Sequence, residues 1–262
     1  MANMTSSVSA SQVAGELASA TFEEIPALVE HYSEDPRQQV KKACERALKR
    51  HAKELAERDR VNAMYDLMAE LGGDGVVVGV DEVGRGSVAG PLTVCAVCLP
   101  MDPRVWGIND SKKLTPARRE LLSVRISEVA RAIGFCHIPP HEIDEIGMAR
   151  ALRKAVAGAV ADTGLTPDCV LMDGNPLGAV PNERDVVKGD AKIACIAAAS
   201  IMAKVTRDEM MVEYDAEYPG YHLAESKGYA SPEHISSIQN KGLSPIHRVS
   251  FCGNFLQTER LF

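Results

Sequence analysis

The sequence lacks any long hydrophobic run. No window of its 262 residues reaches the roughly 18 consecutive apolar residues that a membrane-spanning helix needs. The N-terminus has no basic region leading into an apolar stretch, so we expect no secretory leader, a cytoplasmic location and no membrane partner. Apolar residues still make up 45% of the chain, which is enough for the core of one large domain, or of one domain with a small addition.

Paired cysteine motifs are scarce. The seven cysteines are odd in number and spread through predicted strands and helices, which argues against a disulfide framework. Only Cys95 and Cys98 make a C-x-x-C pattern, and no second pair completes a zinc site. Because both lie in a predicted strand over residues 92–99, a spacing of three places them on opposite faces. A structural role is therefore favoured over a metal or redox role.

Basic residues are absent from the first 35 positions, although six acids lie there. Residues 37–60, in contrast, carry nine Lys and Arg against four acids. The formal net charge of -7 does not favour nucleic acid as a partner, but this segregation is what a local backbone-binding surface on an acidic protein requires.

The N-terminal region divides into two parts. Residues 1–20, rich in Ser and Ala, are expected to form a loose tail, and residues 21–71 a helical extension with a break near Ser33 to Pro36. In its second helix one face is apolar, with Val40, Cys44, Ala47, Leu48 and Leu55. Another face is basic, with Lys42, Arg46, Lys49, Arg50 and Lys53. The basic face is either an arm for nucleic acid or an ordinary solvated face, and the sequence leaves both open.

After residue 75 the pattern becomes that of an α/β domain with a mixed sheet. Helices are expected from Thr115 onward and at about 140–162, 192–213 and 232–240. Strands are expected at about 76–82, 92–99, 133–138, 169–172 and 185–187.

Acids appear where three of these strands end. They are Asp81 and Glu82, then Asp173 before a glycine, then Asp190 after a glycine. Strand ends of α/β sheets are where ligands collect, so acids far apart in sequence can converge there. Four converging carboxylates repel unless a cation lies among them, and oxygen ligands without His or Cys favour Mg²⁺ or Mn²⁺ over zinc. Two such ions are suited to in-line attack on a phosphodiester.

A Gly-Arg-Gly turn, Gly84 to Gly86, follows the first acid pair. Glycines let backbone N–H groups approach a ligand closely, and Arg85 offers the side chain best shaped for phosphate. An exposed acid pair that closes a hairpin is the competing interpretation of this motif alone.

Taken together, the motifs resemble those of bacterial ribonuclease HII. The segment Gly79 to Gly86 with Ala89-Gly90-Pro91 is similar to the family's signature, apart from Ser87, where many relatives carry proline and where we expect no effect on the chemistry. The other matching segments follow in the family's order over about residues 76–252: Asn109 to Leu114, Met172 to Gly174, Lys188 to Asp190, Ala197 to Asp208, Ser226 to Tyr229, and His247-Arg248.

The resemblance implies an RNase H-like fold for residues 72–262, with a mixed central sheet flanked by helices. It also implies endonucleolytic cleavage of the RNA strand in RNA–DNA hybrids and at single ribonucleotides in duplex DNA. Asp81 would bridge two metal ions, Mg²⁺ or Mn²⁺, with Glu82, Asp173 and Asp190 completing the site. Attack on the phosphate 5′ to the ribonucleotide would leave 3′-hydroxyl and 5′-phosphate ends.

The same resemblance implies a set of substrate contacts. The Gly84-Arg85-Gly86 backbone and Tyr229 would read the 2′-hydroxyl that marks a ribonucleotide, and Lys112 would contact a phosphate near the cut. From the residues alone, Tyr229 would be a half-buried core tyrosine and Lys112 a solvated loop lysine.

Other candidates are weaker. His137 and His141 have the spacing of a helical metal pair, but two intervening prolines break any such helix. Arg207 and Asp208 are expected to make pairs along their helix. His247 and Arg248 are either structural or in contact with substrate, and the sequence leaves both open.

Two rival functions remain at the level of sequence. One is another two-metal nuclease on the same fold, against which the Gly-Arg-Gly turn and Tyr229 argue. The other is a non-catalytic nucleic-acid-binding protein, which would not need all four acids. A monomer is expected.

Overall fold

The computed structural model describes residues 8–256, and the chain divides into two compact units between Asn62 and Ala63. This boundary lies within helix α3 (Gln38–Gly72), earlier than the predicted division at residues 71–72. The two units are described separately.

The first unit contains α1 (Ala10–Ser19), α2 (Ile25–His31) and the first part of α3. The prediction of a loose tail over residues 1–20 is wrong for residues 10–19, which are helical; residues 1–7 lie outside the described part of the chain. Ser9 and Gln12 form a reciprocal capping box that starts α1. Val13 and Leu17, four residues apart, are fully buried against Ile25 and Val40, so the tail has an apolar face that the Ser/Ala composition concealed.

The predicted faces of α3 are partly correct. Val40, Cys44 and Ala47 are buried as expected, but Leu48 and Leu55 are 46% and 44% exposed. Arg50 also differs from the expectation of a free basic face. Its guanidinium donates to the carbonyl oxygens of Leu17, Ala18 and Ala20 at the C-terminal end of α1. Such bonds satisfy carbonyls that a helix end leaves without partners, so Arg50 has a structural task.

Within residues 63–256, the second unit forms a five-stranded sheet that is mixed, as predicted, and has the strand order β3-β2-β1-β4-β5. The strands are β1 (Val77–Val83), β2 (Leu92–Cys98), β3 (Ala132–Ile138), β4 (Cys169–Asp173) and β5 (Glu183–Val186). The first three pair antiparallel, whereas β4 pairs parallel to β1 and β5 parallel to β4. Parallel pairing of β1 and β4 brings their carboxyl ends to the same edge of the sheet.

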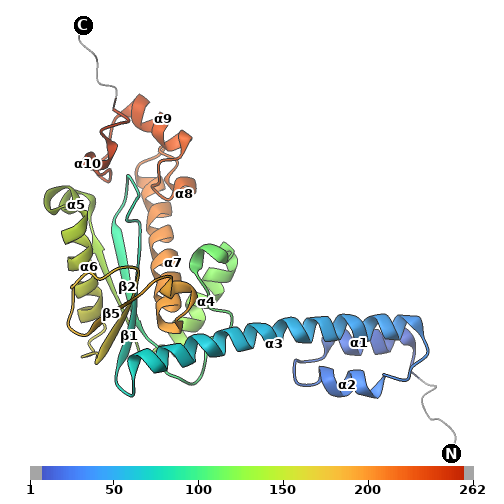
Figure 1. Ribbon diagram of the computed structural model, residues 1–262. Helices are drawn as coiled ribbons and strands as arrows, with labels where there is room; N and C mark the ends of the chain where they lie inside the picture. The colour runs from blue at the N-terminus through green and yellow to red at the C-terminus, as the bar shows by residue number, and fades with distance from the viewer. Residues whose placement is uncertain (1–7, 257–262) are drawn as a thin grey trace, which may run out of the picture. The chain divides into compact units, whose positions relative to one another are not determined.

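Helices cover both faces of this sheet (Figure 1). On one face, α6 (Met148–Asp162) packs Leu152, Ala155 and Val156 against apolar side chains of β1, β2 and β4. On the other face lies α7 (Ala194–Glu217), which approaches β1 so closely that a Cβ on Gly79 would meet the backbone of Cys195. The run of small residues Ala197 to Ala199 in α7 is fully buried at this interface.

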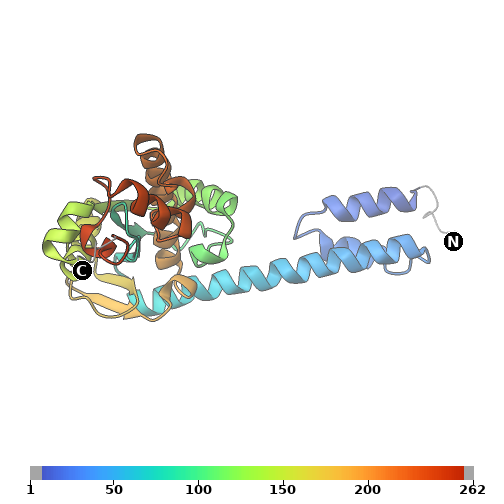
Figure 2. The same cartoon turned by 90° about the horizontal axis from the view of Figure 1, so that it is seen from above.

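The remaining helices surround the ends of this core. The α4 helix (Pro116–Val129) begins with Thr115 as its N-cap, and α5 (Pro140–Ile146) precedes α6. The short helices α8 (Leu223–Ser226), α9 (Pro232–Lys241) and α10 (Val249–Cys252) gather at one end of α7 (Figures 1 and 2). They share an apolar cluster with Val88, Ala89 and Met211.

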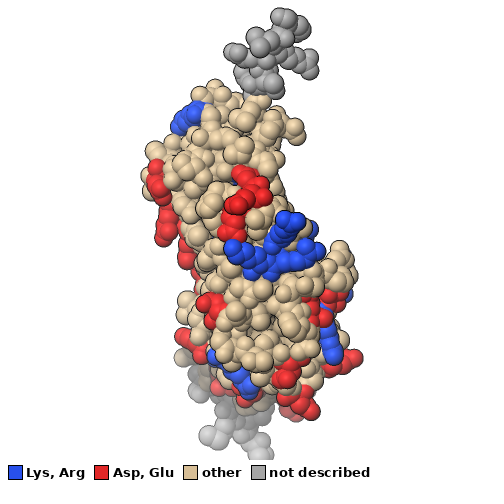
Figure 3. Space-filling model, turned by 90° about the vertical axis from the view of Figure 1, so that its left-hand side faces the viewer, with Lys and Arg blue, Asp and Glu red and all other residues tan. Residues whose placement is uncertain are grey.

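Charges of both signs lie on the face formed by α5 and α6, where a basic group stands beside acidic side chains (Figure 3). On α6, Arg150, Arg153 and Lys154 are exposed, and Lys154 Nζ lies 2.7 Å from Glu142 Oε1 of α5. Among residues 8–256, no helix is both long and apolar enough to cross a membrane.

Candidate active site

Three predicted acids meet at the carboxyl ends of two adjacent strands. Asp81 and Glu82 lie near the end of β1, and Asp173 is the last residue of β4. The register pairs Val80 with Met172, so the next residues along each strand, Asp81 and Asp173, are neighbours at one edge.

The fourth acid, Asp190, reaches the same edge through the short 3₁₀ helix η2 (Gly189–Ala191). The amide of Gly189 donates to Asp173 Oδ1 over 2.7 Å, which fixes η2 beside the end of β4. A Cβ at position 189 would lie 2.6 Å from Ile196 Cδ1 of α7, so the end of that side chain would have to shift to admit it. Asp190 is 7% exposed.

Burial, and after it the charge of neighbouring acids, raises the pKa values of Asp81, Glu82 and Asp190. Burial of the carboxyl group, followed by the charge of Glu82, raises the pKa of Asp81 to about 8. Burial also raises the pKa of Glu82, although Arg85, whose Nη1 lies 3.6 Å from Glu82 Oε1, acts against this rise. For Asp190 the pKa is raised by burial and then by the charge of Asp173. Excess negative charge has therefore accumulated at this edge of the sheet.

Lys112 faces the same negative charge from the 3₁₀ helix η1 (Ser111–Lys113). Partial burial alone would lower its pKa, but the carboxylates of Asp110, Asp81, Asp190 and Asp173 together raise it. The predicted phosphate contact thus lies within electrostatic reach of three of the four acids.

The segment that follows the Gly-Arg-Gly turn is hydrogen-bonded to the segment that carries Tyr229. The amides of Val88 and Ala89 donate to the carbonyl oxygen of Gly228 over 2.9 and 3.1 Å. Gly84 and Gly228 have φ angles of +84° and +78°, which glycine adopts without strain. The Tyr229 side chain is 40% exposed, so it is available for contacts and is not the core residue that its sequence context alone indicates.

The comparisons with known proteins now decide the family. The family model described as Ribonuclease HII matches residues 78–254, and a second, Ribonuclease HII N-terminal domain, matches residues 9–67. A ribonuclease HII from Lachnoclostridium phytofermentans is 43% identical over 225 residues, which cover 85% of this chain and 88% of that protein. The chain belongs to the ribonuclease HII family.

Solved structures agree with this assignment. The crystal structure of ribonuclease H2 from Pyrococcus horikoshii OT3 superposes with a TM-score of 0.58 at 28% identity, covering 66% of this chain and 92% of that chain. Bst-RNase HIII in complex with Mn²⁺ has the same fold at 18% identity and a TM-score of 0.56, covering 70% of this chain and 69% of that one. The protein is a nuclease that hydrolyses phosphodiester bonds, and its family cleaves the RNA strand of RNA–DNA hybrids.

The donor chemistry of the ribonuclease HII site suits a hard divalent cation. All four acids supply carboxylate oxygens. Because burial and then neighbouring carboxylates raise the pKa values of Asp81, Glu82 and Asp190, a positive charge at this site would relieve repulsion. Within residues 8–256, no three His, Cys, Asp or Glu side chains are already drawn together closely enough to enclose an ion. The residues therefore fit a divalent ion chemically, with small side-chain movements needed to enclose it.

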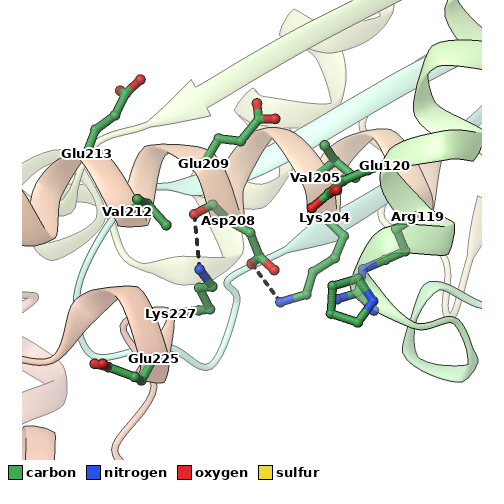
Figure 4. A pocket seen from close by; sticks show the side chains of 11 residues that line it. Arg119, Glu120, Lys204, Val205, Asp208, Glu209, Val212, Glu213, Glu225 and Lys227 are labelled. Atoms are coloured by element: carbon green, nitrogen blue, oxygen red, sulfur yellow. Dashed lines mark hydrogen bonds and ion pairs between the residues drawn. The ribbon is translucent and has the colours of Figure 1, made fainter.

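A groove of about 640 Å³ opens between α4, α7 and α8 (Figure 4). On its floor Lys204 Nζ pairs with Asp208 Oδ1 over 2.7 Å, and Lys227 Nζ donates to the backbone oxygen of Asp208. Arg119 on its α4 side donates to the carbonyl oxygens of Ser111 and Leu114. The groove is thus bordered by the loop that carries Lys112 and by the segment that leads to Tyr229.

Two serines of the site were missed from the sequence. The hydroxyl oxygens of Ser200 of α7 and Ser111 are hydrogen-bonded to each other over 2.9 Å, and a hydrogen bond between Ser200 and Asp81 opposes the rise in the pKa of Asp81. Both lie in segments that resemble ribonuclease HII motifs, but a serine in a motif does not reveal its partner. The bond ties α7 to the loop before α4.

The structure also shows where the weaker candidate residues lie. His137 lies on β3, where its Nδ1 is 3.0 Å from Thr93 Oγ1, while His141 is exposed on α5, so they form no pair. Asp208 makes the expected helix pair, with Lys204. Arg207 does not: its side chain is buried and binds backbone oxygens of other segments, because the loops around α7 lack internal partners for their carbonyls.

Proposed function

We propose that the second unit cleaves immediately 5′ to single ribonucleotides embedded in duplex DNA, as well as within RNA–DNA hybrids, leaving 3′-hydroxyl and 5′-phosphate ends. The observation that carries this proposal is the convergence of Asp81, Glu82, Asp173 and Asp190 beside a turn suited to reading ribose. The catalytic domain then comprises residues 72–262, preceded by a helical extension over residues 21–71, and acts as a monomer.

The four acids would hold two ions, with Asp81 between them. Bound Mg²⁺ or Mn²⁺ would supply a nucleophilic water and stabilise the leaving oxygen. Asp81 is placed for a shared ligand because it stands between Glu82 on its own strand and Asp173 on the next. The raised pKa of its carboxyl group means that the ions, once bound, would keep it in the charged form.

Lys112 and Arg85 would neutralise the substrate backbone. The ammonium of Lys112 stays protonated because its pKa is raised, and it faces the acids where the scissile phosphate would lie. Arg85 is 61% exposed in its side chain and pairs with Glu82 over 3.6 Å, so a phosphate would compete with one exposed ion pair for its guanidinium.

Ribose recognition would fall to the backbone of Gly84 to Gly86 and to Tyr229. A protein distinguishes one ribonucleotide from its DNA neighbours only through the 2′-hydroxyl. Backbone groups of a glycine turn reach that hydroxyl without obstruction, since a Cβ at position 86 would meet no other atom within 4 Å. The exposed ring of Tyr229 would pack on the adjacent sugar.

A labelled DNA duplex with one ribonucleotide tests this proposal. Incubation with Mg²⁺ or Mn²⁺ should give a single cut 5′ to the ribonucleotide, and EDTA should remove it. An all-DNA duplex of the same sequence is the matched control and should stay intact. Binding without any cut, on this substrate and on a hybrid, would favour the non-catalytic alternative, whereas preference for a branched junction would favour another two-metal nuclease.

A further inference from the structure

Two arginines of the second unit are fully buried without a carboxylate partner. Arg207 of α7 and Arg248, just before α10, both have 0% exposure. Throughout residues 8–256, neither lies within ion-pair distance of an Asp or Glu. Burying a charge is costly unless hydrogen bonds to the protein replace those to water. The hydrogen bonds that these two side chains make therefore indicate their role.

Arg207 joins three segments. Its Nε donates to the carbonyl oxygen of Pro91 over 2.9 Å, and its Nη1 donates to that of Lys227 over 2.8 Å. Its Nη2 donates to Ala89 O and to Ser87 Oγ, over 3.0 and 2.7 Å. One planar group therefore fixes the end of the glycine turn against the segment that leads to Tyr229.

Ser87 connects the Arg207 side chain to Gly84 through two hydrogen bonds. Its hydroxyl accepts from Arg207 and itself donates to the carbonyl oxygen of Gly84 over 2.9 Å. Ser87 is fully buried, so no water competes for these bonds. The position that we expected to be neutral is instead the link between Arg207 and the first glycine of the turn.

Arg248 holds the other side of the same turn. Its Nε and Nη2 both donate to Gly90 O, over 3.1 and 2.9 Å, and its Nη1 donates to Arg85 O over 3.2 Å. Its backbone amide also donates to Val88 O over 2.8 Å. Arg85 is the residue proposed to bind phosphate. Its backbone carbonyl oxygen is thus held in place by the guanidinium of Arg248.

We propose that Arg207 and Arg248, with Ser87 as the link to Gly84, are positioning residues that hold the glycine turn and the Tyr229 segment in the single relative placement needed to select the scissile phosphate. The inference rests on the proposed function, because it assumes that these two segments read the ribonucleotide. Arg207 and Arg248 touch neither the reacting atoms nor the acids; they act through the carbonyl oxygens that they bind.

The shape of guanidinium explains the choice of arginine. A fork of five N–H donors can serve several carbonyls at once, whereas a lysine ammonium at the same site reaches fewer with poorer geometry. Burial lowers the pKa of Arg207 and lowers that of Arg248 to about 10, so both stay charged at neutral pH. Two glycines make this close packing possible. A Cβ at position 84 would clash with the Arg207 side chain, and a Cβ at position 228 would clash with the carbonyl oxygen of Ala89.

The test maps cut positions in a DNA duplex carrying four consecutive ribonucleotides. We expect the wild-type protein to cut at one preferred bond. R207K and R248K should spread the cuts over neighbouring bonds and lower kcat by about 100-fold, the cost of roughly 1 Å of misplacement. S87A, a smaller change, should shift the cut pattern in the same direction, and its effect should be non-additive with R207K.

If Arg207, Arg248 and Ser87 only stabilised the fold, their variants would behave differently. Unfolded molecules do not cut, so a loss of stability would lower the rate in proportion to the folded fraction and leave KM and the cut pattern unchanged. That result in S87A and in either lysine variant would overturn the inference, as would full activity of R207K. R184K is the matched control: Arg184 also donates to a backbone oxygen, that of Leu71, but it is exposed and bonds to neither segment.

The outcomes for the two proposals are distinguishable. If the wild-type protein makes no cut at the ribonucleotides, the proposed function itself fails. If the wild-type protein cuts and the variants keep its pattern, only the positioning role fails. Because S87A removes one hydroxyl from a buried site, it gives a result even if the arginine variants do not fold.

Discussion

Asp81 shows how one residue can serve catalysis at the expense of stability. Its carboxyl group is buried among other acids, and its pKa is raised to about 8. Replacing the group with an amide of the same shape removes the repulsion but also removes the proposed shared ligand. Stability and activity should therefore move in opposite directions at this position.

For D81N we expect cleavage to fall to background while the free energy of unfolding in EDTA rises by about 0.5–2 kcal/mol, a usual gain when a strained functional group is neutralised. Urea unfolding and the single-ribonucleotide assay measure the two effects. Asp74 is exposed in the loop before β1, so D74N is the control and should change neither. Retention of activity in D81N would remove this acid from the proposed site.

A second residue-scale feature is a buried histidine pair behind Tyr229. His234 Nε2 and His247 Nε2 are 3.0 Å apart, so one nitrogen must donate and the other accept. His247 is 3% exposed, and burial followed by the charge of His234 lowers its pKa to about 4. Burial also lowers the pKa of His234.

Stability should therefore depend on pH below neutrality. The folded protein holds His247 in the neutral form, whereas the unfolded chain takes up a proton near pH 6.5. We expect the contribution of this pair, taken as the difference in the free energy of unfolding between the wild-type protein and H234Q/H247Q, to be complete above that value and to fall by about 2–3 kcal/mol as the pH decreases toward 4. The raised pKa of Asp81 acts in the opposite direction, but it does so in both proteins and cancels from the difference. Urea titrations of both proteins from pH 7 to 4 test this, with H141Q as an exposed control that keeps the wild-type slope.

At the scale of elements, most of the fold followed from local patterns. The valines of β1 and β2, the Thr115 cap of α4 and the alternation of strands and helices correctly predicted the mixed sheet. The convergence of the acids was also expected, because parallel strands end at one edge. The helix within the supposed tail was missed although Val13 and Leu17 have helical spacing, because the Ser/Ala composition concealed them. The exposure of Leu48 and the carbonyl partners of Arg207 are tertiary facts, and they leave no periodic signal in the sequence.

The contact between β1 and α7 gives a prediction at this scale. Adding a methyl group at Gly79 would press on the backbone of Cys195 and Ile196, which has no freedom to yield. We expect G79A to lower the free energy of unfolding by about 1–3 kcal/mol, the usual cost of overpacking. Activity should fall as well, because the shift would move Ser200 relative to Asp81.

Gly15 provides the matched control for this prediction. It lies within α1, where a Cβ would meet no other atom within 4 Å. Alanine there should raise stability by about 0.5–1 kcal/mol, since glycine is costly inside a helix. Equal responses of G79A and G15A in urea unfolding would contradict the tight packing between β1 and α7.

At the scale of the whole molecule, charge is unevenly distributed. The chain carries a net charge of -7, yet Lys42, Arg46, Lys49 and Lys53 follow one another at helical spacing on α3 and are exposed. Arg50 is excluded from this set by its bonds to α1. A basic stripe on an acidic protein is an electrostatic feature suited to a polyanion.

We expect the variant K42Q/R46Q/K49Q/K53Q to raise KM for an RNA–DNA hybrid and to reduce its dependence on salt, with kcat unchanged. Each phosphate that the variant no longer neutralises should make the plot of log affinity against log salt shallower by about 0.9. A control removes Arg150 and Arg153, which are exposed on α6 of the second unit. Equal effects in both variants would reveal only the change in net charge, and no effect would identify the stripe as a solvated face.

The edge of the sheet has a consequence for how the protein behaves in concentrated solution. The strand β5 closes one side of the sheet with four residues, three of which are Glu183, Arg184 and Asp185. Unpaired edge strands recruit other chains when they are long, flat and apolar, and short charged ones do not. The carboxylate of Glu183 is further occupied by the amides of Leu177, Gly178 and Ala179, which fold a loop beside the strand. This edge therefore resists the strand-by-strand growth that leads to amyloid.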